Sequence, residues 1–272
     1  MRSPAMNTPE SNLPPRPNEL RELLALKFGD ILTTGWGVQR RQRFGYFTPD
    51  DWYEALIHRY VQPETVWLDV GGGRSLFPHN LALSQLLSQR CTFLAGVDPS
   101  PNILDNPFVH DRAQCLLEDF TSPHQFDLAT FRMVAEHVTD PPKVIQTLQR
   151  LLKPGGRVVI YTVYRWSPIT LASRLVPFGL HHRIKRFFWG GEEKDTFPAV
   201  YRMNTHRELK RLFHAGDFEE RLFLQLDDLA AFSQIKPLNW LELVAWKILH
   251  SVGLRYPESC LLGVYQKMSL AA

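Results

Sequence analysis

The chain has 272 residues, of which 44% are hydrophobic and 22% charged, a balance typical of a globular protein with a buried core. Its formal net charge of +3 is too small to indicate a nucleic-acid-binding protein by itself. The three cysteines, Cys91, Cys115 and Cys260, are far apart, which argues against a disulfide framework and a zinc site. No stretch approaches the roughly 20 apolar residues that span a bilayer, and no apolar signal sequence is present at 1–20. We therefore expect a cytoplasmic protein.

The first part of the chain is predicted to precede the main sheet. Residues 1–18 are rich in Pro, Asn and Ser, which is typical of a disordered leader. Residues 19–64 are predicted to form an N-terminal helical lid, with helices at 19–28 and 48–61. The stretch GWGVQRRQRFGYF at 35–47 is predicted to connect the two helices.

From residue 65 the hydrophobic pattern changes. Short apolar runs without polar alternation are typical of strands buried on both faces of a parallel sheet. Such runs lie at 65–70, 92–98, 114–119, 126–131 and 157–163. Helical segments are predicted between them at 78–89, 100–105 and 141–152. This alternation predicts an α/β core over 65–163 with helices on both faces of the sheet.

The rest of the chain is predicted to cap the core and to complete the sheet. Residues 164–204 are predicted as an insertion that caps the substrate site. Residues 205–272 are predicted to supply two more strands and an inserted helix at 237–254. The insertion and this helix both mix basic and apolar side chains, which fits peripheral membrane contact or a cap packed against the sheet. The cap is the favoured interpretation.

Three consecutive glycines follow the first predicted strand, and two cofactor classes compete for such a loop. A dinucleotide fingerprint requires G-x-G-x-x-G with an acid about 20 positions later. Gly71 and Gly73 fit its first two glycines, but Leu76 replaces the third and Asp98 lies too far along the chain. Asp69, just before the loop, would repel a pyrophosphate and attract the ammonium group of S-adenosylmethionine. The residues therefore favour S-adenosylmethionine, which leaves the reaction as S-adenosylhomocysteine.

At this point the chain resembles the class I S-adenosylmethionine-dependent methyltransferases, particularly the type 11 small-molecule group that includes quinone-biosynthesis enzymes. Four stretches carry the resemblance: VWLDVGGGRS, LAGVDPSPNIL, LLEDF and FDLATFRMVAEHVTDPPKVIQTLQRLLKPGGRVVI. The resemblance implies an α/β, Rossmann-like, seven-stranded and mostly parallel sheet with helices on both faces. It also implies an antiparallel last strand, and the predicted architecture includes an α-helical cap. Ser75 departs from the family, which usually has a glycine there.

The resemblance also implies cofactor contacts. Asp98 matches the acid that holds the two ribose hydroxyls, and Asp119 matches the acid that reads the adenine amino group. Simple strand-end capping is the alternative role for these acids. For Arg132 two roles stay open, binding of an acidic substrate group and a solvated position in the loop. The complete predicted set is Asp69, Gly71, Gly72, Gly73, Arg74, Asp98, Pro99, Asp119, Phe120, Phe131 and Arg132.

Candidate catalytic and substrate-binding residues follow the fourth strand or lie in the insertion. His137 is a candidate general base, because imidazole titrates near neutral pH; its alternative role is to hold the loop together with Glu136. The residues predicted to line the acceptor site are Met133, Tyr161, Tyr164, His181 and Tyr201. No carboxylate cluster suggests a metal ion, so none is predicted.

The predicted function is methyl transfer from S-adenosylmethionine to a small, lipophilic or aromatic acceptor, with oxygen favoured over nitrogen or carbon. Nucleic acid is not the expected substrate, because FRMV replaces the Asn/Asp-Pro-Pro-aromatic element of enzymes that methylate exocyclic base amines. Two alternatives stay open. One is a Rossmann-type NAD(P)-dependent oxidoreductase, and the other is a non-catalytic module that binds S-adenosylmethionine.

Overall fold

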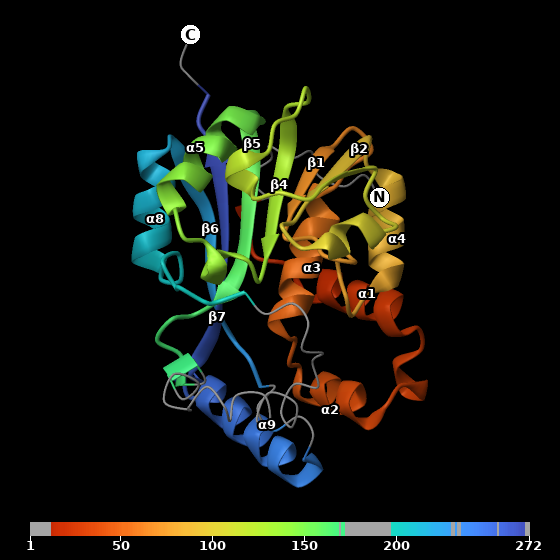
Figure 1. Ribbon diagram of the computed structural model, residues 1–272. Coiled ribbons are helices and arrows are strands. Elements are labelled where there is room, and N and C mark those ends of the chain that lie inside the picture. The colour runs from red at the N-terminus through yellow and green to blue at the C-terminus, as the bar shows by residue number, and fades with distance from the viewer. Residues whose placement is uncertain are drawn as a thin grey trace.

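The structure is a computed structural model and describes residues 12–168, 170–171, 197–229, 232, 235–254 and 256–269. Its strands are β1 (Val66–Val70), β2 (Phe93–Val97), β3 (Asp111–Ala113), β4 (Phe126–Arg132), β5 (Leu152–Val163), β6 (Phe218–Asp227) and β7 (Glu258–Lys267). They form a seven-stranded sheet in the order β3-β2-β1-β4-β5-β7-β6 (Figure 1). Strands β1 to β5 pair in parallel, whereas β7 is antiparallel to both β5 and β6. The predicted Rossmann-like sheet with an antiparallel last strand is confirmed.

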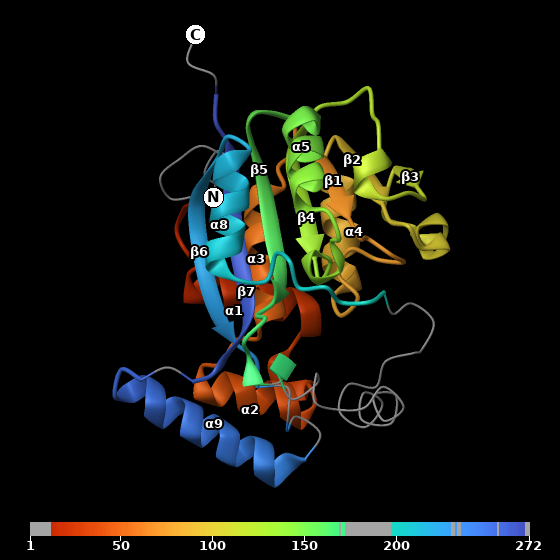
Figure 2. The same ribbon diagram turned by 60° about the vertical axis from the view of Figure 1, so that its left-hand side comes forward.

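Helices cover both faces of this sheet. The α-helices of the described residues are α1 (Pro17–Phe28), α2 (Trp36–Phe44), α3 (Pro49–Tyr60), α4 (Leu81–Arg90), α5 (Pro141–Leu151), α8 (His206–Ala215) and α9 (Lys236–Ser251). Short 3-10 turns are η2 (Ile31–Thr33), η3 (Pro101–Asp105), η4 (Leu117–Asp119) and η5 (Ala135–His137). Helices α1, α3 and α4 cover one face, and α5 and α8 cover the other (Figure 2). Helices α2 and α9 lie together beyond the carboxyl ends of the parallel strands (Figure 1).

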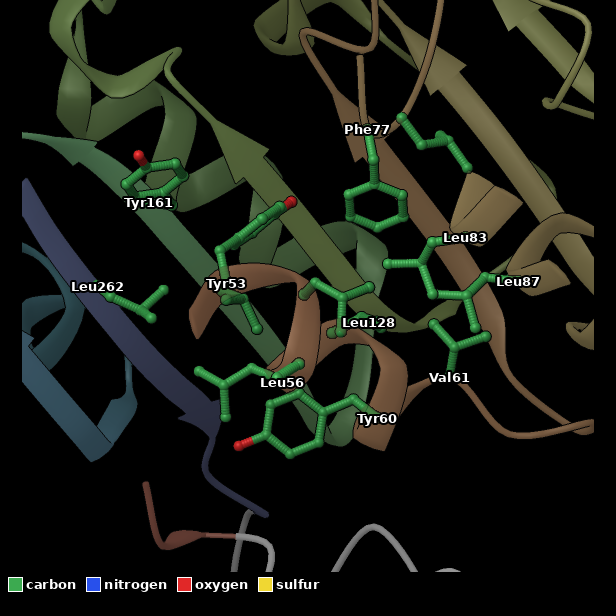
Figure 3. Packing of buried hydrophobic residues seen from close by; sticks show 14 of the residues in the cluster. Tyr53, Leu56, Tyr60, Val61, Phe77, Leu83, Leu87, Leu128, Tyr161 and Leu262 are labelled. Atoms are coloured by element: carbon green, nitrogen blue, oxygen red, sulfur yellow. The ribbon is translucent and has the colours of Figure 1, made fainter. Parts of the chain in front are cut away.

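The core divides into two layers because successive side chains of a strand point to opposite faces. In β1, Trp67 joins the cluster under α1, α3 and α4, whereas Leu68 joins the cluster under α5 and α8. Figure 3 shows the first cluster, to which α3 contributes Leu56 and Tyr60 and α4 contributes Leu83 and Leu87. Each such large apolar side chain stabilises the fold by roughly 1.5–3 kcal/mol.

Polar contacts attach the N-terminal helices to the core. Helix α3 begins with a capping box in which Asp51 N–H donates to Thr48 Oγ1 at 3.3 Å and Thr48 N–H donates to Asp51 Oδ2 at 2.8 Å. Lys27 of α1 donates to Glu54 Oε1 at 3.1 Å. Asn80, which caps α4, donates to Glu54 Oε2 at 2.8 Å. Glu54 therefore joins three helices, and burial raises its pKa.

Three local predictions were wrong. The strand expected at 114–119 is not formed there. A three-residue strand, β3, lies just before this stretch, and the turn η4 covers its second half. Strand β3 pairs only with β2 at one edge of the sheet, and its sequence DRA is largely exposed, so it lacks the apolar pattern of a buried strand. The connector expected at 35–47 contains helix α2, and the helix expected at 100–105 is the 3-10 turn η3.

The other predictions concern the boundaries of the chain's parts. Of the leader 1–18, the structure describes residues from 12 onward, and α1 begins at Pro17. Most of the insertion 164–204 lies outside the described residues, and the division into parts stays a prediction. No described helix has the length and apolarity needed to cross a bilayer. Within the described ranges, no three His, Cys, Asp or Glu side chains group as metal ligands.

Candidate functional site

A cleft of about 720 Å³ opens at the carboxyl ends of β1, β2 and β4. Ligands of open α/β sheets bind at this edge, where the strand order reverses. Here the reversal lies between β1 and β4, because β2 and β3 continue on the other side of β1. Predicted residues that line the cleft are Asp69, Gly71, Gly72, Gly73, Arg74, Asp98, Pro99, Phe131, Arg132, Met133 and His137.

At Gly71 and Gly72 the glycine loop has room for backbone only. Gly71 has φ 75°, a conformation that favours glycine, and its N–H donates to the carbonyl of Val97 at 2.7 Å. A Cβ atom at Gly71 would overlap the side chain of Val134, and one at Gly72 would stand 2.6 Å from Asp69 Oδ2. The missing side chains let the loop pass close to the cleft between two strand ends.

Asp98, at the end of β2, is oriented by the backbone. Its Oδ2 accepts a hydrogen bond from Gly73 N–H at 3.0 Å, and its Oδ1 accepts one from Ser100 N–H at 2.8 Å. Each carboxylate oxygen has a second lone pair, and Asp98 lines the cleft although it is 7% exposed. The residue therefore fits the predicted role of accepting hydrogen bonds from two neighbouring hydroxyls.

Asp69, at the end of β1, is held by a chain of side-chain hydrogen bonds. Thr130 Oγ1 donates to Asp69 Oδ1 at 2.6 Å and itself accepts from Trp67 Nε1 at 2.8 Å. Burial raises the pKa of Asp69 to about 7; the Thr130 hydrogen bond opposes this rise and the charge of Asp98 adds to it. Sequence reasoning missed Thr130, whose signal is that it is polar within the apolar strand β4.

Arg132, at the end of β4, is paired inside the protein. Its Nε and Nη2 both donate to Asp50 Oδ1, at 3.1 and 2.7 Å, and Asp50 lies in the first turn of α3. Burial lowers the pKa of Arg132, but the charge of Asp50 and the hydrogen bonds to it outweigh burial, so the pKa is raised. Arg132 is thus a cation on the cleft wall that also connects β4 to α3.

His137 lies in η5 on the opposite wall. Its Nδ1 is 3.2 Å from the carbonyl oxygen of Pro198, and its ring packs edge-on to Phe197 at 6.3 Å. Because a carbonyl oxygen only accepts, this hydrogen bond requires the proton on Nδ1 and leaves a lone pair on Nε2. Both Phe197 and Pro198 line the cleft, and sequence reasoning assigned neither of them to the site.

Several predicted residues are not brought to the cleft. Asp119 is 61% exposed at its side chain and lies 3.5 Å from Lys143 Nζ, whereas its neighbour Glu118 lines the cleft. Phe120 is buried in the core beside Phe126, with ring centroids 6.4 Å apart. The structure therefore does not support cofactor contacts for Asp119 and Phe120.

The predicted acceptor residues are also separated. Tyr161 is buried in the core, where its ring stacks on Tyr53 at 5.4 Å (Figure 3). Tyr164 packs at the margin of the other core cluster, and Tyr201 donates its N–H to the carbonyl of Glu136 at 3.1 Å. None of these three tyrosines is among the cleft-lining residues. His181 lies outside the described residues.

Apolar side chains make up much of the cleft wall beyond the glycine loop. They come from η4, the end of β4, η5, α5 and the segment 197–200. The members are Leu116, Leu117, Phe131, Met133, Val134, Val138, Val144, Phe197 and Val200. A pocket of this size, mostly apolar with a few polar groups, is typical of small-molecule sites.

Comparisons with known proteins agree with this geometry. A family model described as "Methyltransferase domain" matches residues 39–221. Ubiquinone biosynthesis O-methyltransferase from Coxiella burnetii (strain RSA 493 / Nine Mile phase I) is 34% identical over 153 residues, 51% of this chain and 61% of that protein. The Pseudomonas aeruginosa enzyme of that name (strain LESB58) is 32% identical over 108 residues, 36% of this chain and 44% of that protein. The chain thus spans less than two thirds of the length of these relatives.

Solved structures share the fold. A putative sarcosine dimethylglycine methyltransferase from Galdieria sulphuraria superimposes with a TM-score of 0.50 at 14% identity, covering 80% of this chain and 85% of that chain. The [4+2]-cyclase SpnF also gives a TM-score of 0.50, at 13% identity over 80% of this chain and 84% of that chain. Since the second is titled a cyclase, the fold alone does not determine the reaction.

Proposed function

The chain belongs to the methyltransferase domain family, and on that premise we propose that it methylates a small, lipophilic or aromatic acceptor, with oxygen as the accepting atom. The family assignment confirms the expected enzyme class, with S-adenosylmethionine as its cofactor. It also disfavours the alternative of an NAD(P)-dependent oxidoreductase. The acceptor and the atom that is methylated belong to the proposal.

The observation that carries the proposal is the pair of strand-end carboxylates beside a glycine loop that has no room for a side chain at Gly71 or Gly72. Asp98 presents oriented oxygens to the cleft, which fits two ribose hydroxyls. Asp69 places a carboxylate under the loop, which fits a cationic ligand and would oppose a pyrophosphate. These residues therefore fit S-adenosylmethionine better than a dinucleotide.

The chain's own residues contribute positioning and proton transfer. When bound, S-adenosylmethionine supplies a methyl carbon that is activated by its sulfonium. The apolar walls hold the acceptor and exclude water, which supplies much of the rate acceleration of such a displacement. The acceptor oxygen bonds to the methyl carbon as the carbon–sulfur bond breaks, and the sulfur keeps that electron pair. The hydroxyl proton passes to Nε2 of His137, whose lone pair is available.

Two observations favour a lipophilic hydroxyl acceptor. The far wall of the cleft is apolar from Met133 to Phe197, which disfavours a strongly charged acceptor at that end. His137, the base candidate on this wall, is needed for a neutral hydroxyl, whereas a carbon or amine acceptor has less need of it. The relatives named O-methyltransferase support the same atom.

Calorimetry on the full chain tests the cofactor site. We expect the wild type to bind S-adenosylmethionine and S-adenosylhomocysteine but not NAD, and Asp98→Ala to bind both sulfur compounds about a hundredfold or more weakly, since two hydrogen bonds to a charged group are lost. Asp111→Ala, an exposed acid in the edge strand β3, is the control and should bind like the wild type. Binding of NAD alone would overturn the proposal.

A screen of lipophilic phenols, acids and amines then tests the reaction. With a phenolic acceptor, His137→Gln should lower kcat by about 10² to 10⁴ with little change in KM, because a general base contributes about that much. The matched control is His214→Gln, at an exposed histidine of α8. Cofactor binding without turnover of any acceptor would favour the non-catalytic module.

A further inference from the structure

Helix α9 leaves a large part of its apolar surface exposed. Its face toward the protein holds Leu243, which belongs to a small buried cluster with Tyr46 and Leu229, and the buried polar pair Asn239 and Glu242, which is joined by a hydrogen bond of 2.9 Å. Its outward face holds Trp240, Leu241 and Ile248, each at least half exposed. A helix on the surface of a globular protein normally turns its apolar stripe inward.

The inward polar side chains are all engaged, so the helix is held in this orientation. Glu242 also accepts a hydrogen bond from the hydroxyl of Tyr256 at 3.1 Å. Trp246 Nε1 donates to Asp227 Oδ2 at 2.8 Å, and His250 Nε2 lies 3.2 Å from that oxygen. Turning α9 over would break these contacts and would expose Leu243. The apolar outward face is therefore a stable feature of the fold.

The apolar surface continues past the end of the helix. We call it the α9 face and define it by its exposed apolar residues: Leu238, Trp240, Leu241, Ile248, Val252 and Leu254. Several exposed large apolar side chains on one helix and just after it are uncommon on proteins that work alone in water and mark a docking surface.

The exposed charged side chains of α2 and α9 themselves have one sign. Helix α2 packs beside α9 (Figures 1 and 2) and contains no acid, and the acid of α9, Glu242, is buried. Arg43 of α2 and both lysines of α9, Lys236 and Lys247, are exposed. The two helices therefore present apolar side chains together with cations and no exposed carboxylate of their own.

A further cation, the buried guanidinium of Arg40, lies between the two helices. Arg40 stacks on Trp36, with Cζ 3.4 Å from the ring centroid, and Lys236 Nζ lies 5.5 Å from that ring. Arg40 is 5% exposed, and its Nε and Nη1 have no hydrogen-bond partner in the described part of the chain. Donors buried in this way are costly unless an acceptor reaches them.

We propose that the α9 face and its cations dock on the surface of a membrane that contains anionic lipids. Exposed Trp and aliphatic side chains beside Lys and Arg are the chemistry that binds such an interface. A second copy of the chain fits less well, because a two-fold contact would place this cationic surface against itself. Docking here would bring the strand-end edge that holds the cleft near the membrane, because α9 lies beyond that edge (Figure 1).

Co-sedimentation of the full chain with vesicles tests the proposal. We expect binding to phosphatidylcholine mixed with phosphatidylglycerol at low salt, and little binding to phosphatidylcholine alone. The double variant Leu241→Ser/Ile248→Ser should bind at least about tenfold more weakly, since each side chain loses its apolar burial. The control Leu86→Ser/Leu104→Ser removes exposed leucines of α4 and η3 and should bind like the wild type.

A charge-reversed pair separates lipid electrostatics from a general loss of binding. Lys236→Glu/Lys247→Glu should lower the affinity about tenfold or more, because each cation near an anionic surface contributes about 1 kcal/mol. The control Lys210→Glu/Arg211→Glu changes exposed cations of α8 and should have little effect. Equal losses in both pairs would overturn the assignment to this face.

Two other occupants of the α9 face give different results. If a second copy covers it, light scattering will show a wild-type dimer that becomes a monomer in Leu241→Ser/Ile248→Ser. If residues of the same chain cover it, this variant will melt several degrees below the leucine control. Either result, or a wild type that does not sediment with anionic vesicles, would overturn the proposal.

Discussion

The strand-end cleft and the α2–α9 pair differ in which side chains they bury and which they expose. In the cleft, the buried carboxylates of Asp69 and Asp98 both accept hydrogen bonds, and their strands hold them at one edge of the sheet. In the α2–α9 pair, the polar side chains Asn239 and Glu242 are paired inside while apolar side chains face outward. The cleft thus offers oriented polar groups to a ligand. The helix pair instead leaves apolar side chains exposed, which is the basis of the proposed docking.

The largest expected effect is on the free energy of unfolding, in a comparison of one glycine of the cleft with one glycine of helix α2. Gly71→Ala should destabilise the protein by about 4 kcal/mol, from a strained backbone at φ 75° plus overlap with Val134. Gly37→Ala, in α2 with open space around it, should instead stabilise by about 0.5–1 kcal/mol. Urea unfolding measures both. Similar changes for the two variants would show that the loop is as tolerant as the helix.

The next effect is a pH dependence that belongs to the cleft. Asp69 has a folded pKa of about 7, above the unfolded value near 4, so folding takes up a proton between these pH values. Its protonation stabilises the fold below about pH 4, and this contribution is lost as the pH rises through 7. Between pH 5 and pH 8 the unliganded wild type should lose about 3 kcal/mol relative to Asp69→Asn.

Urea titrations of both proteins at the two pH values measure this difference. The comparison cancels the titration of the groups that do not interact with Asp69. Parallel stability curves would mean that Asp69 is ionised throughout. The same ionisation should favour a cationic ligand, so S-adenosylmethionine should bind the wild type more tightly at pH 8 than at pH 6.

The smallest expected effect on stability concerns Arg40 in the α2–α9 pair. Arg40→Met removes buried donors that lack partners and keeps an apolar stem, so it should stabilise the protein in solution by about 1 kcal/mol. The same variant should bind anionic vesicles more weakly than the wild type. A loss of stability without a change in vesicle binding would assign Arg40 a purely structural role on Trp36.

Most of the central sheet could be predicted because buried parallel strands have a distinctive composition. The runs in β1, β2, β4 and β5 are apolar on both faces, and both faces are covered by helices. The edge strand β3 was not predicted, because an exposed strand of three residues needs no apolar pattern. Helix α2 was missed because Gly35, Gly37 and Gly45 suggest a loop, whereas Gly35 and Gly45 cap the helix.

The site was predictable where a strand end determines the position of a side chain. Asp69 and Asp98 directly end or follow central strands, so their places in the motif determine where they lie. Asp119 lies in the turn η4, which follows an irregular segment, so its position is not determined by a strand end. In this turn the neighbouring residue, Glu118, lines the cleft instead. The Arg132–Asp50 pair joins residues 82 positions apart, which no local pattern reveals.

The sequence left the orientation of α9 open between a membrane-facing helix and a cap packed on the sheet. The mixture of basic and apolar side chains fits both, and the cap was favoured. The orientation is decided instead by hydrogen bonds from Trp246 and Tyr256 to Asp227 and Glu242. Side-chain pairing of this kind depends on β6 and on the segment before β7, which come together only in the folded chain.

The place of β7 in the sheet has a consequence for synthesis on the ribosome. Strand β7 lies between β5 and β6, although it follows both in the chain. Until residues 258–267 leave the exit tunnel, Val158–Ile160 of β5 has an unpaired apolar edge, which is a template for association with other nascent chains. Translation speed over the last helix and strand therefore sets how long this edge is at risk, and chaperone binding should be strongest in that interval.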